Sequence, residues 1–234
     1  MNRESNKFIL IFASIMVIVV ALVLSLAHEA LKDTQQKNVQ VDTMQQILRS
    51  IKVEATNENA ESKFKELISE IYLVDADGNK IPDTSEEAFN LDMKKELKNA
   101  LEKRRYPVFE AKIDGDTKYI MVLAGKGLWG DIWGYISVNS DGNTVYGADF
   151  SHAGETPGLG AEISTYLFSD QFAGKHLFRE RTFKAIAIVK SGRSAADRDY
   201  VDGISGGTIT GNGVQAMIYD SLEGYGNFLV KHQQ

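Results

Sequence analysis

The chain has 234 residues, 43% hydrophobic and 25% charged, which is enough for one large or two small globular domains. Its formal net charge is −6, and no basic cluster is interleaved with aromatic residues, which argues against a nucleic-acid partner. Cysteine is absent and the four histidines are scattered, so disulfides, thiolate catalysis, cysteine-ligated iron–sulfur clusters and a built-in metal site are not expected. Any redox chemistry therefore needs an organic cofactor.

The clearest signal is the uncharged, mostly apolar run at residues 8–27. As a helix it matches a hydrocarbon core of roughly 30 Å. The alternative is a cleaved signal peptide, because Ser25 and Ala27 would suit a cleavage site. The run is longer than the usual signal-peptide core of about 7 to 15 residues, which favours a retained anchor. Arg3 and Lys7 precede it, so the positive-inside rule predicts a cytoplasmic N-terminus and a periplasmic main domain.

Beyond this run, apolar residues recur at helical spacing over 44–51 and 64–71, which predicts two amphipathic helices. A short strand is predicted over 72–74, and a third helix over 91–104. Short alternating segments separated by Asp, Gly and Asn then predict β-strands. The candidate strands are 108–112, 119–124, 133–138, 144–150 and 183–189.

These patterns predict an α+β protein with one N-terminal transmembrane helix, helical segments and a mostly antiparallel β-sheet domain. The expected parts are a cytoplasmic N-terminus at 1–7, the transmembrane helix at 8–27, a helical membrane-proximal region at 28–105 and the α+β domain at 106–234.

Three glycine-rich segments interrupt the strand pattern, at 125–134, 152–162 and 202–213. Each alone has a simple explanation, because glycine clusters are mostly turns. Three of them in one domain predict the rim of a ligand site, since glycine allows backbone amides to approach a ligand closely.

The third segment feeds a helix, because apolar residues after Thr210 recur at helical spacing. The turn Ser205-Gly206-Gly207-Thr208 therefore lies at a helix N-terminus, where free N–H groups and the helix dipole stabilise a phosphate. The sequence has neither a Walker motif nor a GxGxxG fingerprint, which disfavours nucleoside triphosphates and dinucleotides. From the residues alone, Thr208 and Thr210 are more simply helix caps, each contributing about 1 kcal/mol.

Residues 202–208, DGISGGT, resemble the Asp-x-x-Ser/Thr-Gly-Ala-Thr flavinylation motif of the FMN-binding domain family. In that family the last threonine carries flavin mononucleotide (FMN) through a phosphoester. The resemblance implies one covalent FMN per chain, attached to Thr208. The sequence departs from the motif at Gly207, where alanine is usual. Glycine is also small, so the substitution keeps the site small.

The resemblance covers nearly the whole chain. Four features together resemble the C-type subunit family of Na⁺-translocating NADH:quinone reductases. They are the single span and the segments GKGLWG, ETPGLG and VDGISGGTITGNGVQ. ETPGLG is shared with the related G-type subunits of ferredoxin:NAD oxidoreductases, whereas GKGLWG is more typical of the C-type family.

The resemblance also implies roles for individual residues. Ser205 and Gly206 would shape the phosphate turn together with Gly207, and Asp202 would help to bind the Mg²⁺–flavin donor during attachment. No residue is expected to be catalytic beyond the flavin itself. The implied wall of the isoalloxazine pocket comprises Glu155, Thr156, Pro157, Gly158 and Leu159.

Two further residues have open interpretations. Trp129 would stack near the flavin ring or pack in the core. Lys190 would place positive charge near the flavin or its phosphate, or lie solvated at a strand end.

The family implies an electron-relay subunit that is not catalytic alone and that passes electrons between an iron–sulfur centre and another flavin in partner subunits. The partners would be the other subunits of a six-subunit complex in the bacterial inner membrane, and a flavin transferase during maturation. The predicted span holds no charge that could carry an ion, so transport would belong to the partners. The alternatives are the G-type subunit of the related complex and a membrane-tethered binding module without a redox role.

Overall fold

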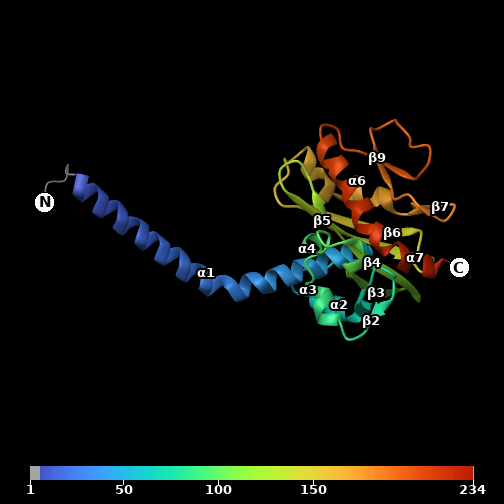
Figure 1. The fold of residues 1–234 in the computed structure, drawn as a ribbon, viewed down its shortest axis with the longest axis horizontal. Helices are drawn as coiled ribbons and strands as arrows, with labels where there is room; N and C mark the ends of the chain where they lie inside the picture. The colour runs from blue at the N-terminus through green and yellow to red at the C-terminus, as the bar shows by residue number, and fades with distance from the viewer. Residues whose placement is uncertain (1–5, 234) are drawn as a thin grey trace. The chain divides into compact units, whose positions relative to one another are not determined.

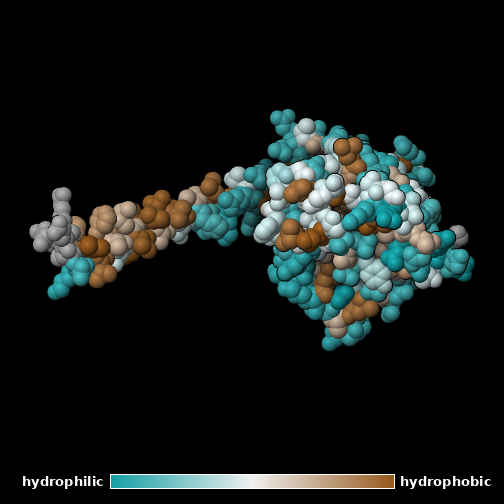
Figure 2. Space-filling model, turned by 90° about the horizontal axis from the view of Figure 1, so that it is seen from above, coloured by the Kyte–Doolittle hydropathy of each residue, from teal (hydrophilic) through white to brown (hydrophobic). Residues whose placement is uncertain are grey.

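The structure is a computed structural model that describes residues 6–233 and divides the chain into two units, 1–43 and 44–234. The first unit consists of most of α1 (Asn6–Ser50), a continuous helix. Its first half exposes apolar side chains, which Figure 2 shows as a hydrophobic surface followed by a hydrophilic one. By length and composition α1 can cross a membrane.

The second unit is built on a six-stranded antiparallel sheet with the strand order β2-β1-β3-β4-β5-β6 (Figure 1). Its strands are β1 (Ile68–Val74), β2 (Lys80–Ile81), β3 (Tyr106–Ile113), β4 (Asp116–Lys126), β5 (Asp131–Asn139) and β6 (Val145–His152). The predicted α+β fold with a mostly antiparallel sheet is confirmed. Four of the five predicted strands fall within β3 to β6, apart from one residue at the start of β6.

Helices and short elements complete the second unit. The α-helices are α2 (Ala60–Leu67), α3 (Ser85–Asn90), α4 (Met93–Glu96), α5 (Tyr166–Ser169), α6 (Thr208–Leu222) and α7 (Gly226–His232). The 3-10 helices are η1 (Leu101–Lys103), η2 (Gly160–Ser164), η3 (Asp170–Phe172) and η4 (Glu223–Tyr225). The hairpin β7 (Phe178–Arg179) and β8 (Thr182–Phe183) precedes the parallel pair β9 (Ala187–Val189) and β10 (Tyr200–Asp202).

Successive side chains of a strand point to opposite faces of the sheet, and helices cover both faces, so each face contributes to a buried core. On one face, side chains such as Val108 and Met121 pack against Val214 and Met217 of α6 and belong to the larger core. On the other face, a second core lies beneath the last turns of α1 and α2. Its central members are Ile47, Leu48, Phe64, Phe109 and Ile120.

Two predicted boundaries are wrong. The helix predicted over 64–71 ends at Leu67, and Ile68 begins β1, because pairing with β3 buries a β-branched and aromatic segment that helical spacing alone would place in a helix. The predicted short strand over 72–74 is the end of β1, and the expected helical region 28–105 supplies two strands of the main sheet. The strand predicted over 183–189 is interrupted, since Ala185 has a φ of 55° and donates its N–H to the carbonyl of Leu177.

The third predicted helix, over 91–104, is replaced by the short helices α4 and η1. After them, the N–H of Arg105 donates to the carboxylate of Glu96, which is buried. This return of the chain toward β3 leaves no room for one continuous helix.

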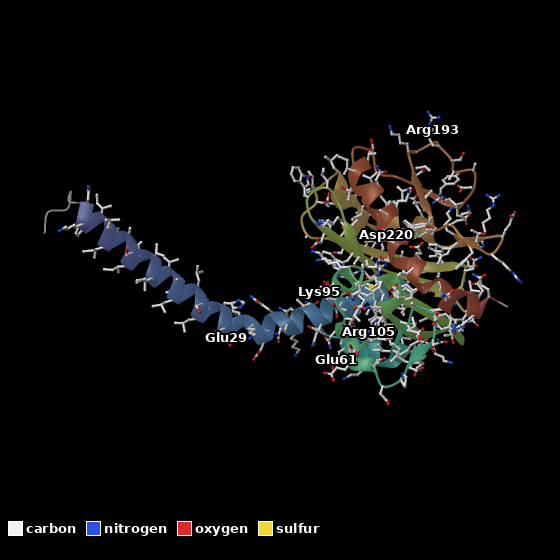
Figure 3. The ribbon with its side chains drawn as sticks, in the orientation of Figure 1. Glu29, Glu61, Lys95, Arg105, Arg193 and Asp220 are labelled. Carbon is white, nitrogen blue, oxygen red and sulfur yellow. The ribbon has the colours of Figure 1, made fainter. Side chains whose placement is uncertain are left out.

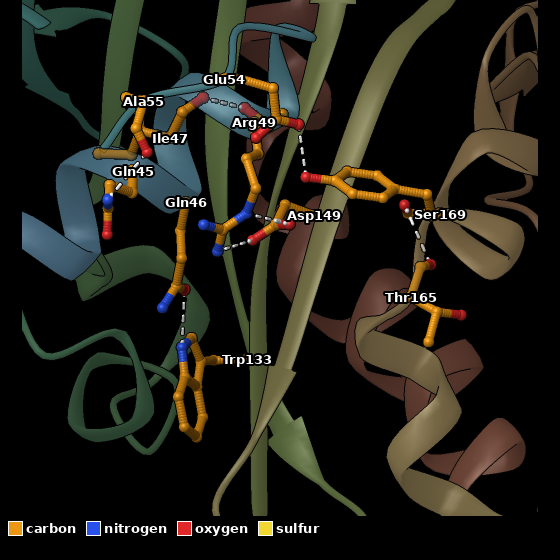
Figure 4. Close-up of polar contacts among 12 residues, drawn as sticks. Gln45, Gln46, Ile47, Arg49, Glu54, Ala55, Trp133, Asp149, Thr165 and Ser169 are labelled. Atoms are coloured by element: carbon orange, nitrogen blue, oxygen red, sulfur yellow. Dashed lines mark hydrogen bonds and ion pairs between the residues drawn. The ribbon is translucent and has the colours of Figure 1, made fainter. Parts of the chain in front are cut away.

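The last turn of α1 is fastened to β5 and β6 by polar contacts (Figure 4). Arg49 forms an ion pair with Asp149, with 2.9 Å between Nε and Oδ1. The indole N–H of Trp133 donates to Gln46 at 2.9 Å, and Ser137 Oγ donates to the carbonyl of Ser50 at 2.6 Å. These strands therefore hold the chain where it leaves α1.

The close approach of Ser50 to β6 gives a test of this packing. A Cβ added at Gly147 would lie 2.5 Å from the Ser50 carbonyl oxygen. We expect Gly147→Ala to lower the free energy of unfolding of the detergent-solubilised chain by about 1 to 3 kcal/mol, because the backbone would have to shift. Gly226→Ala is the matched control, since nothing lies within 4 Å of its added Cβ. Equal thermal midpoints for the two variants would contradict the packing.

Candidate functional site

The three glycine-rich segments meet at the start of α6. Segment 125–134 joins β4 to β5, segment 152–162 follows β6, and segment 202–213 connects β10 to α6. Two hollows flank the first turn of α6, and Gly206, Gly207 and Thr208 line both of them. The predicted ligand rim therefore corresponds to one location in the fold.

The first hollow, of about 540 Å³, lies between β9 and α6, which are side by side in Figure 1. Its walls come from residues 188–191, residues 203–208 and the pair Gly211 and Asn212. The parallel pairing of β9 with β10 places Val189 opposite Asp202. Because parallel strands end at the same edge, Lys190 is brought beside the turn that leads to Thr208.

Thr208 is the first residue of α6 and its side chain is exposed. Among residues 6–233 its hydroxyl has no hydrogen-bond partner. The preceding turn needs glycine, because Gly206 has a φ of 76°. The first N–H groups of α6 have no partner within the helix and carry the positive end of its dipole. An exposed free hydroxyl therefore lies where a phosphate is stabilised.

The second hollow, of about 260 Å³, lies on the other side of Thr208, against segment 152–162. Three apolar residues line it and are unusually exposed: Leu128 at 48%, Leu159 at 42% and Ile209 at 59%. Thr156 and the carboxylate residue Glu155 complete the wall. Apolar surface with a few polar groups is the usual lining of a site for an aromatic ligand.

Glu155 is buried and joins the surrounding segments. Its Oε1 accepts the N–H of Trp129 at 2.9 Å, and its Oε2 accepts the hydroxyl of Thr210 at 2.6 Å. Burial alone would raise the pKa of Glu155, but hydrogen bonds from Thr210, Trp129 and Gly130, with the nearby His152, outweigh it and lower the pKa below its ordinary value of 4.5. The group is therefore a carboxylate at neutral pH.

The predicted site residues do not all reach the hollows. Ser205 and Lys190 line the first hollow, whereas Gly158 and Asp202 line neither. Asp202 is held by its backbone, which exchanges two hydrogen bonds with the side chain of Gln171.

The structure excludes one interpretation of Trp129 and leaves both interpretations of Lys190 open. Trp129 is 71% exposed, which excludes core packing, and its side chain lines neither hollow. Lys190 is exposed at the start of the turn to Arg193, whose side chain points away from the domain (Figure 3). Within the described part of the chain, Lys190 has no ion-pair partner.

Several lining residues were not predicted individually. They include Leu128, Ile188, Ile204, Ile209, Thr210 and Asn212. Most lie inside the glycine-rich segments, so the prediction of a ligand rim covered them as parts of these segments. Exposed apolar side chains within a predicted ligand rim could have indicated Leu128 and Ile209.

Residues 127–223, which include every residue that lines the two hollows, match the FMN-binding domain family. This is the class of protein to which the part of the chain that holds the site is similar. The C-type subunit of the Na⁺-translocating NADH-quinone reductase from Vibrio campbellii is 34% identical over 98% of this chain and 96% of its own length. The corresponding subunit from Yersinia pestis is 42% identical over 49% of this chain and 44% of its own length.

Solved structures agree with these relatives. The crystal structure of the same subunit from Parabacteroides distasonis matches with a TM-score of 0.80 and 53% identity, over 85% of this chain and 96% of that one. NqrC from Shewanella oneidensis matches with a TM-score of 0.68 and 27% identity, over 84% and 99%. The chain belongs to the family of C-type subunits of Na⁺-translocating NADH-quinone reductases, as the sequence motifs predicted.

The lowered pKa of Glu155 gives a prediction with a definite sign. Its stabilising contribution is present above pH 4.5 and is lost as the pH falls through the lower pKa of the folded state. We expect Glu155→Gln to be less stable than wild type by roughly 1 to 3 kcal/mol at pH 7, and the difference to shrink below pH 4.5. Urea unfolding of the variant and of wild type, at pH 7 and below pH 4.5, measures this difference in stability.

Glu58→Gln is the matched control, because Glu58 is exposed and bonds to no described residue. A Glu155→Gln deficit that stays constant from neutral pH to well below pH 4.5 would show that ionisation of Glu155 contributes nothing.

Proposed function

We propose that this chain carries one FMN, esterified through its phosphate to Thr208. The observation that carries the proposal is the exposed, unpartnered hydroxyl of Thr208 at the N-terminus of α6, between two hollows. One hollow has the cation Lys190 at its wall, and the other has exposed apolar side chains. Together they offer separate environments to a charged phosphate and to an aromatic ring system.

Attachment requires an activated phosphoryl group, which a flavin dinucleotide supplies in its pyrophosphate. Thr208 Oγ1 forms a bond to the phosphorus that bears the flavin, and the pyrophosphate P–O bond breaks. The adenosine monophosphate portion leaves and the hydroxyl proton is released to solvent. A Mg²⁺-dependent flavin transferase would catalyse this step, with Asp202 exposed near the acceptor for contact with the metal-bound donor.

The chain's own residues would then hold the group in place. The free N–H groups at the start of α6 would bind the phosphate, together with Ser205, Gly206 and Gly207 in the turn. Leu159 and Thr156 would contact the ring from segment 152–162, as Leu128 and Ile209 would from the opposite walls. The flavin, when bound, supplies the redox chemistry. Lys190 would favour its reduced, anionic forms by charge.

The larger function follows from the family. We propose an electron-transfer subunit of a Na⁺-translocating NADH:quinone oxidoreductase, which relays electrons between an iron–sulfur centre and another flavin in partner subunits and is not catalytic alone. The full-length similarity to the C-type subunits supports this over a G-type subunit and over a non-redox binding module. The complex would have six subunits in the bacterial inner membrane, with the domain of this chain in the periplasm and α1 as its anchor.

The covalent link is tested by the mass of the denatured chain. We expect the chain isolated from its native host to carry the mass of one FMN less one water and to fluoresce as flavin after denaturation. Thr208→Ala should lose both signals, because Thr208 carries the exposed hydroxyl in the first turn of α6. Thr210→Ser, which keeps its hydroxyl, is the matched control and should retain them. A colourless wild-type chain would overturn the proposal.

The absence of cysteine makes the membrane topology directly measurable. Single-cysteine variants Asn6→Cys and Lys37→Cys lie on opposite sides of the apolar stretch of α1 and are both exposed. With a membrane-impermeant maleimide, we expect intact spheroplasts to label Lys37→Cys only. Labelling of Asn6→Cys should require permeabilisation, and the reverse pattern would place the domain in the cytoplasm.

A further inference from the structure

Two threonines at the start of α6 are placed in opposite ways. Thr208 is exposed, whereas Thr210 is 2% exposed. Residues two apart on a helix are separated by about 200°, so one faces out when the other faces in. Both have a hydroxyl within the same helical turn, and this raises the question of what makes one of them the acceptor.

The Thr210 hydroxyl is already committed to a buried partner. It donates to Glu155 Oε2 at 2.6 Å, and the carboxylate residue is 4% exposed. The contact is enclosed on one side by Gly160, where an added Cβ would lie 2.4 Å from Thr210 Oγ1 and 2.5 Å from Glu155 Oε2. On the other side, a Cβ at Gly127 would lie 2.5 Å from Glu155 Oε1. Gly160 therefore leaves the space that this bond occupies, and Gly127 leaves the space of the other carboxylate oxygen.

Glu155 connects all three glycine-rich segments. Its Oε1 accepts the N–H of Trp129 from the first segment, and its own backbone N–H donates to Nδ1 of His152 in the second, at 3.1 Å. The hydroxyl of Thr210 joins it to the third segment. The bond between Glu155 and Thr210 thus sets how the first turn of α6 is rotated against the other two segments.

We propose that Thr210 and Glu155 are a positioning pair that selects Thr208 as the phosphate acceptor. The hydroxyl of Thr210 points into the protein, so it cannot reach a donor in solvent. The negative charge of Glu155 beside it repels a phosphoryl group. The bond also holds α6 in the rotation that presents Thr208 between the two hollows. This inference rests on the proposed attachment of FMN at Thr208 and extends it to two residues that never touch the phosphate.

The consequence is kinetic and can be separated from a general effect on folding. When the unmodified full chain in detergent is incubated with flavin transferase, Mg²⁺ and flavin adenine dinucleotide, intact mass gives the rate of attachment. We expect Thr210→Val to slow it by about tenfold, since the lost bond to a charged group lets the turn rotate. Thr210→Ser should restore the wild-type rate, because serine keeps the donor. Thermal midpoints of all variants show whether they fold.

Glu155→Gln provides a second variant for the case in which Thr210→Val does not fold. An amide has one oxygen, so if that oxygen accepts from Trp129, the NH2 group faces Thr210 and the charged hydrogen bond is replaced by a weaker neutral one in the opposite direction. We expect a rate several-fold below wild type. The double variant should be no slower than the slower single variant, because both changes remove the same charged hydrogen bond.

Several outcomes overturn the inference while leaving the proposed function intact. They are a wild-type rate in folded Thr210→Val or in Glu155→Gln, rate losses that multiply in the double variant, and flavin on Thr210 in peptides of the wild-type chain. A wild-type chain that accepts no flavin at all, by contrast, overturns the proposed function itself.

Discussion

The arrangement of the site depends on the hydrogen bonds that the buried carboxylate of Glu155 accepts. A charge taken out of water is costly unless it is hydrogen-bonded on all sides, and breaking such a set strongly destabilises a protein. Here the donors come from Trp129, Gly130 and Thr210, in segments far apart in the sequence. This placement of the carboxylate requires glycine at positions 127 and 160, because any side chain there would displace it.

The sheet was largely predictable because its strands follow simple rules. In β3 to β6, short apolar runs end at Asp, Gly and Asn turns, and each strand buries both faces against helices. Local sequence patterns gave the wrong secondary structure where contacts with residues distant in the sequence determine it. Residues 68–71 satisfy helical spacing, yet pairing with β3 makes them a strand. The break at Ala185 depends on hydrogen bonds to Leu177, which no local pattern contains.

The site was predictable in part, for a related reason. Helix spacing predicted that the turn 205–208 leads into a helix, and the structure begins α6 at Thr208, the last residue of that turn. The position of a residue in the sequence does not determine whether its side chain faces a hollow. The sequence left open whether Trp129 packs in the core, and the structure shows its indole exposed and its backbone N–H bonded to Glu155. The different orientations of Thr208 and Thr210 were available from helix geometry alone, since two residues turn the helix by about 200°.

The parallel pairing of β9 with β10 has a consequence for how the chain folds. The walls of the two hollows come from four parts of the chain that are not neighbours in the sequence. They are Leu128, four residues of segment 152–162 (Glu155, Thr156, Leu159 and Gly160), residues 188–191 and residues 203–212. Contacts of such long range form late, since loop-closure entropy is lost before they become favourable. A partly folded chain has the motif but lacks the walls. Any ligand that needs all four stretches can therefore occupy only molecules that have completed assembly, and its presence distinguishes mature copies from immature ones.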